Sequence, residues 1–317
     1  MKEIWAYLKK YIQDHFDAHL YASLAVFLII CTWINYTYDF ENSIIDSVSR
    51  TWWHWLFMSL FMSFPFLIGC VLLYVFNINR TWIKSTEFWL LFFVGFSLLG
   101  FSRSLFIHYD LIKHLDAIDY HFARKVMWRA KSFFTLFIPL MLFYFWYERK
   151  RDIPNQWYGL SIKNTDFRPY FILLIAVIIG IGFASFLSDL TNYYPRYIPS
   201  GGERFAQKHE LASWIPMVIY EGFYGTDFVN VELFFRGFLV IGFSRVLGGQ
   251  AVIAMVGSYM FLHYGKPITE AISSVFGGYL LGILAFYSKR IWGGIILHVA
   301  LAWSMEFFAW LQRLYGN

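Results

Sequence analysis

The feature that most constrains this chain is a series of long apolar runs separated by short polar segments. A helix needs about 20 apolar residues to cross the roughly 30 Å hydrocarbon core of a bilayer. The sequence therefore predicts an all-α, polytopic transmembrane helical bundle of eight or nine spans. The runs are Leu20–Tyr38, Trp52–Phe76, Phe88–Ile107, Ser132–Tyr147, Pro169–Leu187, Leu211–Leu247, Gln250–Tyr264, Thr269–Tyr287 and Ile291–Leu311.

Composition excludes the water-soluble classes. The 317 residues are 58% hydrophobic and 15% charged, whereas a soluble domain has about 25% charged residues. The net charge of +5 lies in the short segments between apolar runs, where it indicates topology and contact with lipid headgroups. We therefore expect membrane lipid as a partner and no nucleic acid.

Two parts of the chain have different compositions. The segment Glu148–Arg168 is polar, contains Pro154 and Asn155, and follows an aromatic-rich region. We predict a domain boundary there, with aromatic-rich transmembrane helices in 1–150 and a Gly-richer membrane module in 151–317.

The distribution of Lys and Arg does not determine the membrane orientation of the helices in residues 1–150. If every run crosses once, the basic clusters at Lys113–Lys131 and Arg149–Arg151 fall on opposite sides of the membrane, against the positive-inside rule. Either Ser132–Tyr147 does not cross fully, or Asp110–Lys131 is an interfacial helix.

The run Leu211–Leu247 is too long for one crossing. Gly222, Gly225 and Asp227 interrupt it. The sequence predicts a short helix, a break, and a second helix that begins near Asp227.

Ionisable residues inside apolar runs are costly, at about 2.5–3.5 kcal/mol each on insertion scales, so they face the protein interior and find partners. Glu232 and Arg236 are four apart, which places them on one helix face in the favourable order for an ion pair. His263 and His298 lie in two further runs, and three helices supplying Glu, His and His favour a functional site over isolated structural residues. The other such residues in this half are Glu221, Asp227, Glu306 and, near a helix start, Glu270.

Other residues recur every four positions, which places them on one face of a helix. His298, Ala302 and Glu306 fall on one face of a helix, whereas Glu221 would share a face with Glu232 only if the helix continued through the glycines. Small residues four apart, which allow another helix to approach closely, occur at Ser274, Gly278 and Gly282; we interpret them as packing.

These motifs resemble a known family. Glu232-x-x-x-Arg236, then Tyr259-x-x-x-His263, then His298 are similar in order and spacing to the intramembrane endopeptidases of the CAAX-protease and bacteriocin-processing group, known as CPBP or Abi proteins. The resemblance covers about half of the chain. It implies peptide-bond hydrolysis by an activated water, without a cofactor. We expect Glu232 and His263 to hold that water, His298 to face the oxyanion and Arg236 to balance the charge of Glu232.

The chain departs from the family pattern at two positions. The first of two adjacent motif glutamates is replaced by Val231, and the Asn four residues after the third-motif His by Ala302; Tyr259 for Phe is milder. General-base catalysis contributes about 10²–10⁴-fold and an oxyanion donor about 10²–10³-fold, so both losses bear on activity. Glu232 itself or Asp227 is a candidate to replace the missing base.

Two functional hypotheses follow, and a metal site is an alternative. The chain is either an endopeptidase acting on a membrane-associated protein or peptide, or an inactive relative that binds a partner helix, peptide or lipid. Zinc held by Glu232, His263 and His298 is a weaker alternative based on ligand preference. Paired broken helices in two related halves, which would favour a transporter, are not visible.

Localisation follows from the apolar runs and the family. We expect a multi-pass integral protein of a bacterial cytoplasmic membrane. Charged and aromatic residues are mixed in residues 1–19, so we expect the first run to act as an uncleaved insertion signal.

Overall fold

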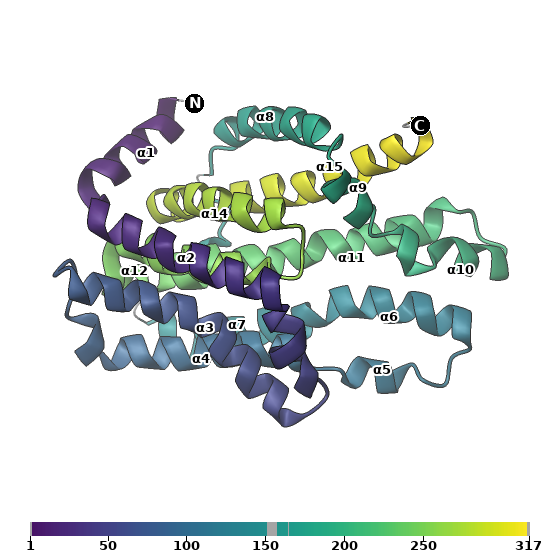
Figure 1. The fold of residues 1–317 in the computed structure, drawn as a ribbon, viewed down its shortest axis with the longest axis horizontal. Coiled ribbons are helices and arrows are strands. Elements are labelled where there is room, and N and C mark those ends of the chain that lie inside the picture. The colour runs from purple at the N-terminus through teal and green to yellow at the C-terminus, as the bar shows by residue number, and fades with distance from the viewer. Residues whose placement is uncertain (1, 151–156, 164, 316–317) are drawn as a thin grey trace. The chain divides into compact units, whose positions relative to one another are not determined.

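The computed structural model describes residues 2–150, 157–163 and 165–315, and over these residues it is helical without strands (Figure 1). Seven described helices are long and apolar enough to cross a membrane, and an eighth is present if the bent pair Arg168–Ala184 and Ser188–Lys208 counts as one span. The prediction of a polytopic helical bundle is therefore confirmed. The seven are Ala18–Tyr38, Trp52–Val75, Thr86–Leu111, Ala117–Glu148, Trp214–Leu262, Ile268–Ser288 and Trp292–Tyr315.

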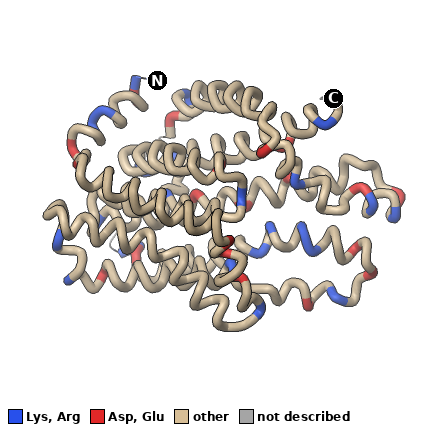
Figure 2. Tube along the Cα trace, viewed as in Figure 1, with Lys and Arg blue, Asp and Glu red and all other residues tan. Residues whose placement is uncertain are grey.

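Charged residues are sparse along these helices. Figure 2 shows long stretches without Lys, Arg, Asp or Glu, with most charged positions near helix ends and in connections. Because the hydrocarbon core cannot hydrate a charge, this distribution is typical of helices that cross a bilayer.

The chain folds into two compact units, each built from three segments. Unit 1 is Met1–Ser104, Pro139–Asp166 and Glu232–Trp292, and unit 2 is Leu105–Ile138, Phe167–Val231 and Gly293–Asn317. The boundary expected between 150 and 151 adjoins residues 151–156, which include Pro154 and Asn155 and lie outside the described residues. That boundary stays a prediction.

Unit 1 is organised around α13 (Ala251–Leu262), in which every residue from Ala251 to Phe261 is buried. The helix contacts α3 (Trp52–Val75), α14 (Ile268–Ser288) and the π-helix η8 (Leu233–Gly242). The other elements, with η marking 3-10 and π helices, are α1 (Lys2–His15), α2 (Ala18–Tyr38), η1 (Glu41–Ile45), η2 (Asp46–Val48), α3 (Trp52–Val75), η3 (Trp82–Lys84), α4 (Thr86–Ser104), most of α7 (Ile138–Phe143), η5 (Tyr144–Glu148), η6 (Trp157–Gly159), η8 (Leu233–Gly242), α12 (Ser244–Leu247), η9 (Gly248–Gln250) and α14 (Ile268–Ser288).

Small residues allow these helices to approach α13 closely. A Cβ on Gly69 of α3 would lie 2.9 Å from Cα of Ala254, and one on Gly278 of α14 would lie 2.7 Å from the ring of Tyr259. The predicted packing role of the small-residue row is thus confirmed, and the row positions the helix that leads to His263.

Unit 2 has an aromatic core. Its principal cluster is Phe122, Tyr220, Tyr224, Phe228 and Ala302, and a second contains Tyr194, Met305 and Ala309. These residues come from the 194–197 loop and from three helices, α6, α11 and α15. The unit's elements are α5 (Ile107–Leu111), α6 (Ala117–Ser132), η4 (Phe133–Phe137), α8 (Arg168–Ala184), α9 (Ser188–Tyr193), η7 (Ile198–Ser200), α10 (Gly202–Lys208), nearly all of α11 (Trp214–Glu232) and of α15 (Trp292–Tyr315).

The predicted break at the glycines is wrong. One continuous helix, α11, runs from Trp214 to Glu232. A helical Gly costs only about 1 kcal/mol relative to Ala, so neighbouring contacts can outweigh it. Gly225 has such a contact, because a Cβ there would lie 3.1 Å from the ring of Trp303.

The fourth span includes the segment whose topology was open. Residues Ala117–Glu148 form a single 32-residue helical run. At 1.5 Å per residue it is about 48 Å long, which exceeds the roughly 30 Å of hydrocarbon. The run is therefore longer than one straight crossing requires.

Candidate functional site

The first motif lies in unit 1 as a fully buried ion pair. Nη1 of Arg236 is 3.0 Å from Oε1 of Glu232, and the two side chains are 1% and 0% exposed. Glu232 is the last residue of α11, and Arg236 lies in the π-helix η8 that begins at the next residue. An uncompensated charge here would be very costly, so each side chain supplies the counter-charge that the other needs in the interior.

Tyr259 connects this pair to the second motif. The guanidinium carbon of Arg236 lies 4.0 Å from the centroid of the Tyr259 ring, a cation–π geometry. The same ring lies 4.7 Å from the imidazole of His263 in an edge arrangement. From the sequence we interpreted Tyr259 only as a mild change from Phe. The one feature that could have indicated its role is its position four residues before His263.

His263 follows the last residue of α13 and is 5% exposed. Its Nδ1 lies 2.9 Å from the backbone oxygen of Tyr259. A carbonyl oxygen only accepts hydrogen bonds, so Nδ1 carries a proton and Nε2 is the basic nitrogen of the neutral ring. The helix end thus sets the tautomer that a general base requires.

The third motif lies in unit 2. His298 is 9% exposed and its ring is 4.4 Å from that of Phe228. The predicted helix face is confirmed, because His298, Ala302 and Glu306 are all buried in α15. Unit 1 therefore groups Glu232, Arg236 and His263, and the approach of His298 to them stays a prediction.

Asp227, a possible substitute base, is engaged within unit 2. Its Oδ1 accepts a hydrogen bond of 2.7 Å from the Ser132 hydroxyl, and its Oδ2 is 3.6 Å from Nη1 of Arg129. Asn230 donates a further 2.7 Å hydrogen bond to Ser132. These contacts give Asp227 a structural role in joining α11 to α6.

Glu306 also has a role that the sequence did not predict. Its carboxylate accepts hydrogen bonds from the backbone N–H of Arg196 at 2.7 Å and of Tyr197 at 3.2 Å. Those residues are about 110 positions away in the chain, so only the folded structure identifies them.

No three His, Cys, Asp or Glu side chains in the described parts of the chain are grouped so that they would hold a metal ion. The zinc alternative combines two residues of unit 1, Glu232 and His263, with His298 of unit 2. It stays a prediction.

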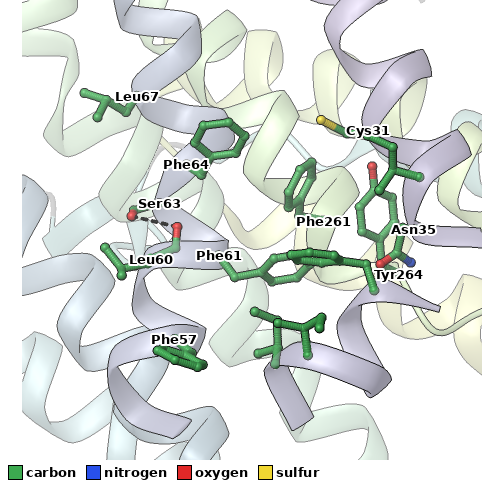
Figure 3. Close-up of a pocket in the computed structure, with 14 residues that line it drawn as sticks. Cys31, Asn35, Phe57, Leu60, Phe61, Ser63, Phe64, Leu67, Phe261 and Tyr264 are labelled. Carbon is green, nitrogen blue, oxygen red and sulfur yellow. Dashed lines mark hydrogen bonds between the residues drawn. The ribbon is translucent and has the colours of Figure 1, made fainter. Parts of the chain in front are cut away.

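An apolar pocket of about 540 Å³ lies in unit 1, beside the end of α13. Figure 3 shows Phe261 and Tyr264, two residues before and one residue after His263 in the chain, near side chains of α2 and α3 such as Cys31 and Phe61. The few polar groups on its wall include Asn35 and Ser63. The pocket suits an apolar ligand segment.

A buried carboxyl, Glu41, follows α2 near this pocket. It is 5% exposed, and Arg103 of α4 lies 3.7 Å away. Burial raises its pKa to about 7, an effect that Arg103 opposes and that Asp46 and Asp39 reinforce.

We expect Glu41 to make stability depend on pH. The folded-state pKa lies above the unfolded-state value, so the folded chain binds more protons between pH 4.5 and 7. The free energy of unfolding should fall as pH rises through this window, by on the order of 3 kcal/mol, and stay level above it. Thermal unfolding of Glu41→Gln in detergent at pH 5 and pH 8 should show that this contribution has gone, while the exposed control Glu210→Gln keeps it. A wild-type slope retained in Glu41→Gln would contradict the assignment.

Comparison with known families supports the motif analysis. Residues 213–304, under a third of the chain, match the model of the type II CAAX prenyl endopeptidase Rce1-like family. Residues 213–304 therefore resemble an Rce1-like domain. The matched segment contains Glu232, Arg236, His263 and His298 and lies within the predicted 151–317 module. Neither the curated proteins nor the solved structures gave a match.

The resemblance inferred from the three motifs is thereby confirmed. The Rce1-like domain indicates the fold of an intramembrane endopeptidase in a multi-pass membrane protein.

Proposed function

We propose that the Rce1-like domain binds a membrane-associated protein or peptide and hydrolyses a peptide bond in it with an incomplete acid–base apparatus. The observation that carries this proposal is the contact series from Glu232 through Arg236 and Tyr259 to His263, within the segment that matches the family. The membrane is expected to be a bacterial cytoplasmic membrane.

In the proposed reaction His263 is the general base. Its Nδ1 contact with the Tyr259 carbonyl places the lone pair on Nε2, which takes a proton from water as the water attacks the scissile carbonyl. The proton then passes to the leaving amine. Glu232, held by Arg236, supplies negative charge that stabilises the imidazolium, and His298 faces the oxyanion.

The apolar pocket beside the end of α13 would receive part of the substrate. Phe261 and Tyr264 flank His263 in the chain and line this pocket, so an apolar segment bound there lies close to the proposed base. No cofactor takes part in the proposed reaction.

Two substitutions favour a second candidate, a protein that binds its partner without cleaving it. Val231 replaces the motif glutamate, and Glu232 is committed to Arg236 at 3.0 Å. Ala302, in place of the motif Asn, is fully buried among the aromatic residues of unit 2.

Cleavage of a library of membrane peptides by the purified protein in lipid nanodiscs distinguishes the two candidates. His263→Ala should abolish cleavage, and Glu232→Gln should reduce it about 10²-fold or more, as expected for loss of acid–base assistance. The exposed pair His209→Ala and Glu210→Gln are matched controls that should leave the rate unchanged. Peptide binding without any cleavage by the wild-type protein would favour the second candidate.

A further inference from the structure

A second cavity lies wholly within unit 2. It has a volume of about 690 Å³ and is lined by residues of α10, α11, α15 and the loop that precedes α10. Three glutamates line it: Glu203, Glu221 and Glu306. None of the described residues on its wall is Lys or Arg.

Aromatic side chains form much of the remaining wall. Trp214 and Trp303 are 59% and 46% exposed, so the described residues leave part of both side chains uncovered. The indole N–H of Trp303 donates a 3.2 Å hydrogen bond to the backbone oxygen of Glu221, which fixes α15 against α11 at the wall. The aromatic residues are Tyr197, Trp214, Trp303, Phe307 and Trp310.

Two basic side chains, Arg129 and Arg196, lie near the cavity but outside its wall, and their charges act on Glu306. Arg129 is paired with Asp227, and Arg196 stacks on the Tyr193 ring at 4.3 Å and is not part of the wall. Glu306 is satisfied by two backbone N–H groups. Glu221 is hydrogen-bonded to Glu306 through their side chains, so these two carboxyl groups share a proton. The cavity wall therefore carries negative charge from this pair and from Glu203.

Two buried polar atoms at this wall have no hydrogen-bond partner among the described residues: Oε2 of Glu221 and the hydroxyl of Tyr197. Burial raises the pKa of the Tyr197 hydroxyl, and the charges of Glu203 and Glu221 raise it further. The side chains of Glu203 and Glu221 are thus both close enough to the Tyr197 hydroxyl to influence it electrostatically.

We propose that this cavity, which we call the acidic aromatic pocket, binds an organic ammonium group that carries no adjacent anionic group. Aromatic ring faces attract a cation, more strongly when it is desolvated, and the carboxylates supply the complementary charge. The volume exceeds that of a small ammonium head, so the pocket also accommodates an apolar body attached to it. A phosphate next to the ammonium would be repelled by Glu203 and by the Glu221–Glu306 pair, with no basic residue among the described wall residues to balance it.

The proposal does not depend on peptidase activity. Its test uses the full chain in an uncharged detergent and isothermal titration with tetraethylammonium, a free organic cation. Phosphocholine, in a parallel titration, represents the lipid-headgroup source of the same ammonium chemistry. Saturable binding of tetraethylammonium, weakened by salt, and much weaker binding of phosphocholine are expected.

Substitutions assign the binding to the pocket. Glu203→Gln, which removes a charge, and Trp214→Leu, which removes an aromatic face, should each weaken tetraethylammonium binding several-fold. Glu221→Gln, which replaces one carboxyl of the Glu221–Glu306 pair, is a second variant with a smaller expected loss. Matched controls outside the pocket, Glu210→Gln and Trp146→Leu, should bind as the wild type does.

Three outcomes would overturn the proposal. They are the absence of saturable tetraethylammonium binding, phosphocholine binding as tight as that of tetraethylammonium, and folded glutamate variants that bind with wild-type affinity.

Discussion

Val231→Glu should raise the rate of peptide cleavage by about 10²–10⁴-fold, the contribution of a positioned general base. Val231 stands where the family has its first motif glutamate, and it is only partly buried, unlike the fully buried Glu232. A carboxylate there has no Arg four residues later, whereas Glu232 is balanced by Arg236. The measurement is the initial rate on a membrane peptide, with wild type and variant compared in the same nanodiscs.

Val231→Gln, which has the same shape without the charge, is the control for Val231→Glu and should not raise the rate. Equal rates for the Glu and Gln variants would contradict the role assigned to this position.

Ala302→Asn is a poorer test of the lost motif. Ala302 is 0% exposed and packs with Tyr224 and Phe228 in the unit 2 core. An amide placed there loses hydration and crowds the aromatic rings, at a cost of about 1–3 kcal/mol for each effect. Any gain in oxyanion stabilisation would thus be offset by a loss of folding stability.

Arg236→Met should lower the free energy of unfolding by about 3–5 kcal/mol, because it leaves the Glu232 carboxylate buried without its counter-ion. The loss includes the cation–π contact of Arg236 with Tyr259. Chemical denaturation in detergent micelles, followed by tryptophan fluorescence, measures the change.

The double variant Glu232→Gln/Arg236→Met should recover much of this loss, since no unpaired charge remains. The exposed Arg204→Met is the control for removal of a guanidinium from the chain. Equal destabilisation in the single and double variants would show that the pair is not ionised in the folded protein.

Much of the fold was predictable because membrane insertion depends on local composition. Runs such as Thr269–Tyr287 and Ile291–Leu311 correspond within a few residues to α14 and α15. The prediction failed at Gly222 and Gly225, where local propensity indicated a break but contact with Trp303 favours a continuous helix. Propensity is a weak local preference, and tertiary packing outweighs it.

In the candidate site, too, local spacing predicted some contacts and tertiary packing determined others. The spacing of Glu232 and Arg236 predicted their ion pair, since i and i+4 positions share a helix face. The place of Tyr259 between Arg236 and His263 depends on packing of η8 against α13, which no local pattern encodes.

By itself the sequence determined the helical membrane fold, the family motifs and the pairs that lie within one helical turn. Only the tertiary structure decided which backbone groups Glu306 binds, that Tyr259 lies between Arg236 and His263, and where carboxyl groups gather in the acidic aromatic pocket. The reason is physical: hydrophobicity and helical periodicity act over neighbouring residues, whereas a buried polar group takes its partner from whatever the fold brings within about 3 Å.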